Sequence, residues 1–216
     1  MGWNGRTVQD WETELSETRT VDIAIAAEDV LRARCYGILA QLLRVPPDAE
    51  TLTMIGSFQT DGTVVGAALA ELGAVARTTD LAAAQDEYSD LFIGLTRGEL
   101  VPYASYYLTG FLYEKPLARL RGDMAKLGIA RADASTEPED HVASLCEIMA
   151  VLIVGAFGAP ADVAAQRAFF DAHLAPWVGR FFEDLEGAAA ARLYKPVGAF
   201  GRVFMGIETE AFAMAA

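Results

Sequence analysis

Apolar residues recur along this chain at the spacing of an α-helix and not at that of a β-strand. In the stretch 21–44 they fall at positions i, i+4, i+7, i+8 and i+11, which share one face of a helix: Leu31, Cys35, Ile38, Leu39 and Leu42. Pro46 and Pro47 follow, and two consecutive prolines predict that this helix ends before them. No stretch alternates apolar and polar residues for long enough to predict a sheet.

The same pattern, with its caps and breaks, predicts further helices along the rest of the chain. Thr79-Asp80 offers an N-cap to the helix after it, and Gly94 to Pro102 is typical of a loop. Thr136 to Glu139 matches the capping box Thr-x-x-Glu, which predicts a helix from there to about Val154. The other predicted helices cover about 48–56, 64–77, 81–92, 103–127 with Pro116 as a potential second start, 161–173, 176–191 and 194–213. These segments predict an all-α fold, a single globular bundle of about eight to ten helices.

The chain is expected to form one domain behind a short tail. Residues 1–20 are polar and are predicted to be a flexible N-terminal tail, while 21–216 form the helical domain. The polar, irregular stretch 131–137 is predicted to be a hinge within that domain. Because 53% of the 216 residues are hydrophobic, the chain can bury a sizeable core, which argues against global disorder.

The net charge limits the partners of this protein. With 30 acidic residues against 17 lysines and arginines, the formal charge is −13 at pH 7. Such a surface repels nucleic acid, whose phosphates require lysine and arginine, so nucleic-acid binding is not expected. A basic partner would be attracted and would meet the protein faster. The alternative is that the acidity only keeps the protein soluble.

Cysteine use and hydropathy indicate a protein of the cytoplasm. Cys35 and Cys146 lie far apart in helical patterns, without a CxxC motif or a nearby cysteine–histidine cluster, so we expect buried thiols and no metal site. Residues 1–20 lack the apolar core of a signal peptide. The longest apolar stretch, Ile148 to Ala161, is shorter than the ~20 residues needed to cross a bilayer, so no transmembrane segment is expected.

A first segment with distinctive residues runs from Glu87 to Gly94. On a helix, Tyr88, Leu91 and Phe92 share one face, at i, i+3 and i+4, and Gly94 can end the helix. This pattern is compatible with plain core packing and equally with the wall of a binding groove.

A second segment, Val101 to Leu108, contains three tyrosines and a serine behind Pro102. Tyrosine combines a large apolar face with a hydroxyl group, which suits the wall of a groove that binds a peptide. The residues concerned are Tyr103, Ser105, Tyr106 and Tyr107. An amphipathic helix start is the other interpretation.

A third segment, Glu137 to His141, places two glutamates and an aspartate beside a histidine. Acidic residues are favoured in a first helical turn, which explains most of it. His141 beside Asp140 could sense pH or bind a basic group. No nucleophile accompanies this pair and His173 is remote in sequence, so neither catalysis nor metal binding is expected, and no phosphate-binding P-loop is present.

Taken in order, these three segments resemble the TorD/DmsD/NarJ family of molybdoenzyme maturation chaperones. The shared pattern is Glu-Tyr-x-x-Leu-Phe-x-Gly, then Pro-Tyr-x-Ser-x-Tyr, then Glu-Pro-x-Asp-His, and the stretch 169–177 is also similar, so the match spans about 24–213. The resemblance implies an all-helical cytoplasmic chaperone, not an enzyme and without a cofactor of its own. It would bind the apo catalytic subunit of a molybdopterin oxidoreductase, often through a basic twin-arginine leader peptide, until the client's cofactor is inserted.

The resemblance also implies which residues contact the client peptide. They are Tyr88, Leu91, Phe92, Pro102, Tyr103, Ser105, Tyr106, Glu137, Asp140 and His141. Carboxylates such as Asp140 suit guanidinium groups, and apolar tyrosine faces suit the apolar part of a leader. Some family members have tryptophan and two prolines where this chain has Val101-Pro102-Tyr103, which leaves the identity of the client open.

Two other functions remain open from the sequence. One is a helical protein that binds or hydrolyses nucleotides, and the other is a permanent adaptor subunit of an oxidoreductase complex. The oligomeric state is open between a monomer and a homodimer that exchanges its C-terminal helices through the hinge at 131–137.

Overall fold

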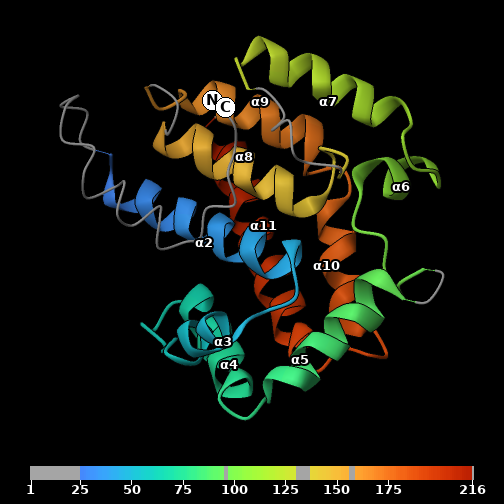
Figure 1. Ribbon diagram of the computed structural model, residues 1–216. Helices are drawn as coiled ribbons and strands as arrows, with labels where there is room; N and C mark the ends of the chain where they lie inside the picture. The colour runs from blue at the N-terminus through green and yellow to red at the C-terminus, as the bar shows by residue number, and fades with distance from the viewer. Residues whose placement is uncertain (1–24, 95–96, 130–136, 156–158, 216) are drawn as a thin grey trace.

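The fold is all-α, as predicted, in the part of the chain that the structure describes. The computed structural model describes residues 25–94, 97–129, 137–155 and 159–215 (Figure 1). Within these ranges it has ten α-helices and one π-helical turn, and no strand beyond an isolated antiparallel bridge between Tyr103 and His141. The elements are α2 Ala27–Arg44, α3 Ala49–Gly56, α4 Val64–Ala76, α5 Leu81–Tyr88, η1 Ser89–Ile93, α6 Ala104–Thr109, α7 Lys115–Lys126, α8 Val142–Val154, α9 Val163–His173, α10 Val178–Gly187 and α11 Tyr194–Met214.

Two central helices organise the bundle. Helix α8 packs along α2, and ten of its thirteen residues are buried, so it is apolar on nearly every side. Helix α11 runs behind it and packs against α10 and α4. Figure 1 shows α7 and α9 along one edge, with α3, α4 and α5 at the opposite edge. Residues 131–136 of the predicted hinge at 131–137, and the predicted tail at 1–20, lie outside the described residues.

Helix α2 buries a broader face than the predicted stripe, and that face includes three of the five predicted positions. Leu31 is 60% exposed, whereas Leu39 and Leu42 are buried as expected. The buried face is centred on Tyr36, which is fully buried and packs edge-on against Phe204 of α11. Leu31 projects from the side away from Tyr36, so its inclusion in the core stripe was wrong.

A buried ion pair joins α2 to α11. The Arg32 guanidinium donates to both carboxylate oxygens of Glu208, at 2.8 and 2.9 Å. The Tyr36 hydroxyl donates to Glu208 at 3.0 Å, and the amide oxygen of Gln166 on α9 accepts from Arg32 at 3.2 Å. Glu208 is 1% exposed, so water cannot hydrogen-bond its carboxylate. The hydrogen bonds from Arg32 and Tyr36 compensate for this loss of hydration.

Local capping explains several boundaries. The Asp80 carboxylate accepts the backbone N–H groups of Ala82 and Ala83 at the start of α5, as the Thr79-Asp80 pattern predicted. The predicted helix 81–92 changes to a π-helical turn after Tyr88, and the N–H of Gly94 donates to the carbonyl of Ser89 at 2.7 Å. Gly94 has φ +60°, and a Cβ there would lie 2.1 Å from the Arg97 carbonyl oxygen, which only glycine avoids.

The long predicted helix at 103–127 is two helices, as the position of Pro116 allowed. Gly110 adopts a left-handed conformation with φ 83° and ends α6. Pro116 then lies in the first turn of α7, where its missing N–H leaves no helical hydrogen bond unmade. The residues between the two helices form an exposed loop.

The start of α8 differs from the prediction. Helix α8 begins at Val142, and Glu137 to Asp140 precede it in a turn closed by the N–H of His141 and the carbonyl of Pro138. The N-cap is His141, not Thr136, which lies outside the described residues. Asp140 is held out of the helix because both its carboxylate and its carbonyl accept N–H groups from the start of α6. The prediction of a capping box was therefore wrong.

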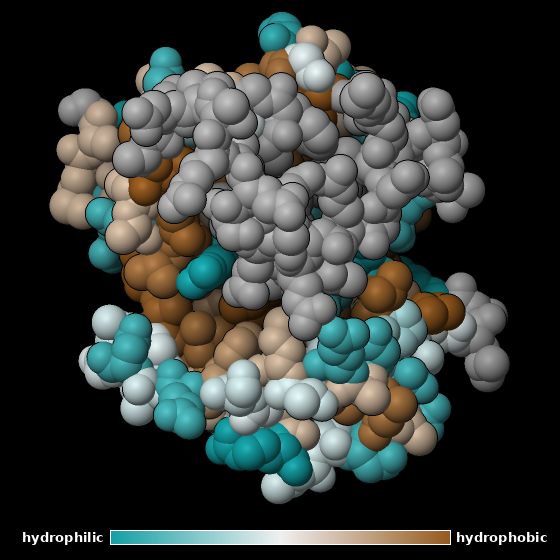
Figure 2. Space-filling model, turned by 60° about the vertical axis from the view of Figure 1, so that its left-hand side comes forward, coloured by the Kyte–Doolittle hydropathy of each residue, from teal (hydrophilic) through white to brown (hydrophobic). Residues whose placement is uncertain are grey.

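Apolar side chains also reach the surface of the protein. Figure 2 shows them in a band across one face, above a lower region that is mainly hydrophilic. No helix in the described ranges has both the length and the apolar character needed to cross a membrane.

Candidate functional site at the junction of α6 and α8

The acidic residue of the first segment is part of the framework of the fold. Glu87 at the end of α5 is 7% exposed, and its carboxylate accepts three backbone N–H groups at the start of α11. The distances are 2.7 Å from Arg192, 3.0 Å from Leu193 and 2.7 Å from Tyr194. Because a helix start has N–H groups without intrahelical partners, Glu87 caps α11 from another helix.

The apolar residues of the first segment pack mainly into the core. Tyr88 and Leu91 are 5% and 0% exposed, while Phe92 is half-buried. The Tyr88 ring lies 5.0 Å from that of Phe92 and 5.9 Å from that of Tyr194, and its hydroxyl donates to the Leu43 carbonyl. These contacts connect α5, η1, α11 and α2.

The second and third segments meet at one junction. The N–H of Ser105 donates to Oδ2 of Asp140 at 2.8 Å, and the N–H of Ala104 donates to the Asp140 carbonyl at 3.0 Å. In the opposite direction, the N–H of Val142 donates to the Pro102 carbonyl at 2.9 Å. The starts of α6 and α8 are therefore hydrogen-bonded to each other, and Asp140 caps α6 across 35 residues of sequence.

Tyr103, Glu137 and His141 form a compact polar cluster at this junction. The Tyr103 hydroxyl donates to Glu137 at 2.6 Å, and the Tyr103 ring lies edge-on to the His141 ring with centroids 5.0 Å apart. Nδ1 of His141 accepts the N–H of Ala143, so in the neutral ring Nε2 carries the proton. Burial lowers the pKa of His141 to about 4, which keeps the imidazole neutral at pH 7.

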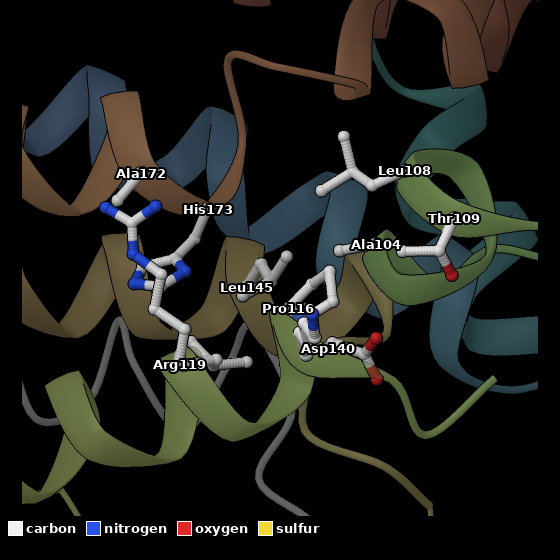
Figure 3. Close-up of a pocket in the computed structure, with 11 residues that line it drawn as sticks. Ala104, Leu108, Thr109, Pro116, Arg119, Asp140, Leu145, Ala172 and His173 are labelled. Carbon is white, nitrogen blue, oxygen red and sulfur yellow. The ribbon is translucent and has the colours of Figure 1, made fainter. Parts of the chain in front are cut away.

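Asp140 also forms part of the wall of a pocket. This pocket has a volume of about 340 Å³ and lies between α6, α7, α8 and α9 (Figure 3). Figure 3 shows Asp140 at one end and Arg119 with His173 at the other, with Pro116 and Leu145 between them. Its lining is mostly apolar: Ala104, Leu108, Pro116, Leu120, Leu145 and Ala172.

Two polar atoms at this junction are buried without a partner among the described residues. They are Oδ1 of Asp140 and the hydroxyl oxygen of Ser105, in side chains that are 1% and 0% exposed. Burying a polar atom without a hydrogen bond costs about 1–3 kcal/mol, and more when it is charged. A carboxylate oxygen in this state, on the wall of a pocket, can accept a donor from a bound group.

Of the ten residues expected to contact the client, only Asp140 lines this pocket. Tyr106 makes its contacts with Arg97 instead. Its hydroxyl accepts a hydrogen bond of 2.6 Å from Arg97, and the Arg97 guanidinium lies over its ring at 5.0 Å. Tyr106 does not line the pocket that Asp140 faces.

Sequence reasoning did not find several residues around the pocket. Glu139, 8% exposed, binds Arg121 of α7 through both carboxylate oxygens, at 2.8 to 3.1 Å. Nε2 of His173 lies 3.0 Å from Asp123 of α7. Arg121 and Asp123 lie on a helix whose placement over the site depends on tertiary contacts, so no local pattern signals them.

Among the described residues, no group of three His, Cys, Asp or Glu side chains could hold a metal ion.

Comparisons with known proteins agree with this architecture. The profile of the family described as nitrate reductase delta subunit matches residues 59–183. The chain is 31% identical over 176 residues to the chaperone protein TorD of Aliivibrio fischeri, covering 70% of this chain and 80% of that protein. It is 30% identical over 126 residues to the chaperone protein TorD of Vibrio cholerae, covering 55% of this chain and 57% of that protein.

The chain belongs to the TorD/DmsD/NarJ family of maturation chaperones. A crystal structure of a putative redox enzyme maturation protein from Archaeoglobus fulgidus has a similar fold, with a TM-score of 0.53 and 22% identity. That likeness covers 88% of this chain and 99% of the other. The junction of α6 and α8 in this TorD-family chain is built by the second and third segments that first indicated the family.

Proposed function

We propose that this TorD-family chain is a cytoplasmic chaperone that binds the apo catalytic subunit of a molybdopterin oxidoreductase through its basic leader peptide. It holds the client for cofactor insertion before export or assembly. The observation that carries the proposal is the carboxylate of Asp140, which is 1% exposed and has Oδ1 unpartnered among the described residues. Asp140 lines a pocket whose walls are mostly apolar and also include Lys115, Arg119 and His173.

This geometry suits an arginine or lysine side chain of a peptide. A guanidinium N–H would satisfy Oδ1 of Asp140, and such charge-assisted bonds are stronger than neutral ones. The apolar walls would pack against the methylene stem of the same side chain. At about 340 Å³, the pocket has room for one or two side chains, so the rest of a peptide would lie on the surrounding surface.

The net charge supports a basic ligand. The chain carries a formal charge of −13, which favours encounter with a positively charged leader and disfavours acidic competitors. The proposal therefore accounts for both the overall charge and the buried unpartnered oxygen.

The test is calorimetric titration with leader peptides of the molybdoenzymes encoded in the same genome. Each peptide is compared with a control in which its two arginines are alanines. We expect one leader to bind with micromolar affinity or better, about −8 kcal/mol, and its control to bind at least tenfold more weakly. Equal binding of a leader and its control would contradict the role of Asp140.

The matched protein variants are Asp140→Asn and Asp80→Asn. Each removes one charge and keeps an oxygen that can cap a helix, α6 in the first case and α5 in the second. We expect Asp140→Asn to weaken leader binding at least tenfold while the fold is retained, and Asp80→Asn to bind like the original chain. A loss of the same size in both variants would show a general charge effect and no specific site.

A further inference from the structure

Helix α11 packs against both α2 and α4, and all three helices expose large apolar side chains. The exposed fractions are 60% for Leu31 on α2, 68% for Val64 at the start of α4, and 42% and 81% for Ile207 and Met214 on α11. Ile207 and Met214 lie at i and i+7, so they share one side of α11. We call these four residues the apolar face. Figure 2 views the side of the molecule on which α2 begins, and apolar surface crosses it in a band.

The surroundings of Cys35 bring the three helices together at this face. Cys35 lies one turn after Leu31, on the same side of α2. Burial, Glu208 on α11 and Asp61 just before α4 raise the pKa of its thiol to about 12. A charge has such an effect only when it is close. Cys35 therefore lies between α11 and the start of α4, and Leu31 continues the same side of α2 into solvent.

An apolar face on three adjacent helices calls for a cover. Single exposed hydrophobic residues are ordinary, but neighbouring ones on several elements mark an interaction surface. The formal charge of −13 makes a second copy a poor partner, because two such chains repel each other. A segment of the same chain carries far less charge, and its covalent link holds it near the face at an effective concentration of about millimolar.

The sequence before α2 supplies such a segment. Residues 1–24 lie outside the described residues and lead into α2, whose second turn carries Leu31. They include two of the three tryptophans of the protein, Trp3 and Trp11. Tryptophan has a large apolar body with one polar atom at its edge, and it is enriched where protein surfaces meet.

Part of this segment has an amphipathic pattern. Val8, Trp11 and Leu15 fall at i, i+3 and i+7, which share one side of a helix. Asp10 and Glu17 fall on the opposite side of the same helix. The residues that connect Leu15 to α2 could span about 30 Å. This connection is long enough for the apolar side to fold back onto the helices beside the start of α2.

We infer that residues 8–15 dock on the apolar face of their own chain and place Trp11 against α11. The protein would then cover this side of α2 itself, which differs from the flexible tail that the polarity of residues 1–20 predicts. None of the four residues of the apolar face lines the Asp140 pocket. The inference therefore goes beyond the proposed function and does not depend on it.

The fluorescence of Trp11 tests this contact. Its emission is the difference between the original chain and Trp11→Phe, because Trp3 and the buried Trp177 are common to both. Acrylamide quenching measures how well solvent reaches the Trp11 ring. A synthetic peptide of residues 1–24, with and without Trp11→Phe, gives the value for an undocked segment.

Two double variants form a matched pair. The face variant combines Leu31→Ser with Ile207→Ser on the apolar face. The control variant combines Val45→Ser with Ile93→Ser, just after α2 and on η1, where the original side chains are 55% and 57% exposed. Circular dichroism melting checks that both variants fold, and gel filtration gives their size.

We expect Trp11 of the original chain to emit at shorter wavelength than in the peptide and to be quenched less. The face variant should lower the ratio of docked to undocked segment about a hundredfold, so that Trp11 is quenched as in the peptide. The control variant should behave like the original chain.

Four results would overturn the inference. Trp11 of the original chain could be quenched as strongly as in the peptide, or the face variant and the control variant could change its quenching equally. A dimer that only the face variant converts to a monomer would assign the apolar face to a second copy. Leader affinity that falls in the face variant and not in the control variant would assign it to the client.

Discussion

The carboxylate of Glu87 accepts a hydrogen bond of 2.7 Å from the backbone N–H of Tyr194, which lies 107 residues further along the chain. The acid that begins the first family segment thus caps the last helix of the structure. Glu87 therefore has a structural role in the first segment. Its carboxylate accepts three N–H groups at the start of α11, which have no partner within that helix.

Replacing Glu87 is expected to destabilise the protein without altering leader binding directly. Glu87→Ala leaves three backbone donors unpaired, two of them buried, and should lower the free energy of unfolding by about 3 kcal/mol. Glu87→Gln keeps one acceptor oxygen and should lose about half as much. Urea unfolding measures both values.

Glu99 provides the control for this prediction. Its carboxylate also accepts two backbone N–H groups, from Ala189 and Ala190, but the side chain is exposed, so water replaces it when it is lost. Glu99→Gln should cost below about 1 kcal/mol. Equal losses at Glu87 and Glu99 would show that burial does not determine the strength of this cap.

His141 is expected to make the folded protein sensitive to acid. Burial lowers its pKa from 6.5 to about 4, so between these values the unfolded chain binds a proton that the folded protein does not. The stability contributed by the neutral ring is complete above about pH 6.5 and is lost as the pH falls toward 4. Protonation would also remove the Nδ1 acceptor that caps α8.

The measurement compares the chain with His141→Asn, whose side-chain oxygen can cap α8 without titrating. Between pH 7 and pH 4.5, the original chain should lose on the order of 2 kcal/mol more than the variant in urea unfolding. Other titrating groups affect both proteins alike and cancel in the difference. Parallel pH profiles would mean that His141 has the same pKa in the folded and unfolded states.

The ion pair between Arg32 and Glu208 should show strong non-additivity. Glu208→Ala leaves a half-buried guanidinium and the Tyr36 hydroxyl without their acceptor and should cost about 3 kcal/mol or more. A double variant, Arg32→Met with Glu208→Leu, replaces the pair by apolar side chains and should be more stable than Glu208→Ala alone. A double-mutant cycle by urea unfolding tests this, and strictly additive losses would argue against direct coupling.

Most helices could be predicted because their signals are local. Asp80 caps the helix immediately after it, and Pro46-Pro47 follow the end of α2. The prediction failed where distant residues determine the conformation. The start of α8 is set by hydrogen bonds from Asp140 to α6, and the buried face of α2 is set by Tyr36 against α11.

The sequence shows the chemistry of the residues at the junction of α6 and α8 but not their arrangement. The chemistry of Tyr103, Asp140 and His141 is visible in the sequence, yet no periodicity indicates that the Asp140 carboxylate meets the N–H of Ser105. The pocket also needs α7 and α9, whose placement follows from packing. The exposed loop between α6 and α7 was not predicted, because Phe111 and Leu112 continue a helical apolar pattern. The left-handed conformation of Gly110 shows that the helix has ended before them.

The bonds that close this fold have consequences for its synthesis on the ribosome. The ion pair of Arg32 with Glu208 joins residues 176 positions apart, and the hydrogen bond of Glu87 with Tyr194 joins residues 107 positions apart. Neither can form until α11 has been made. A nascent chain without α11 therefore has an arginine without its Glu208 partner, a Glu87 carboxylate without the N–H groups that it caps, and an exposed apolar side of α4. We expect native structure to form only after α11 has left the exit tunnel, so this chaperone completes its own folding after translation has passed its last helix.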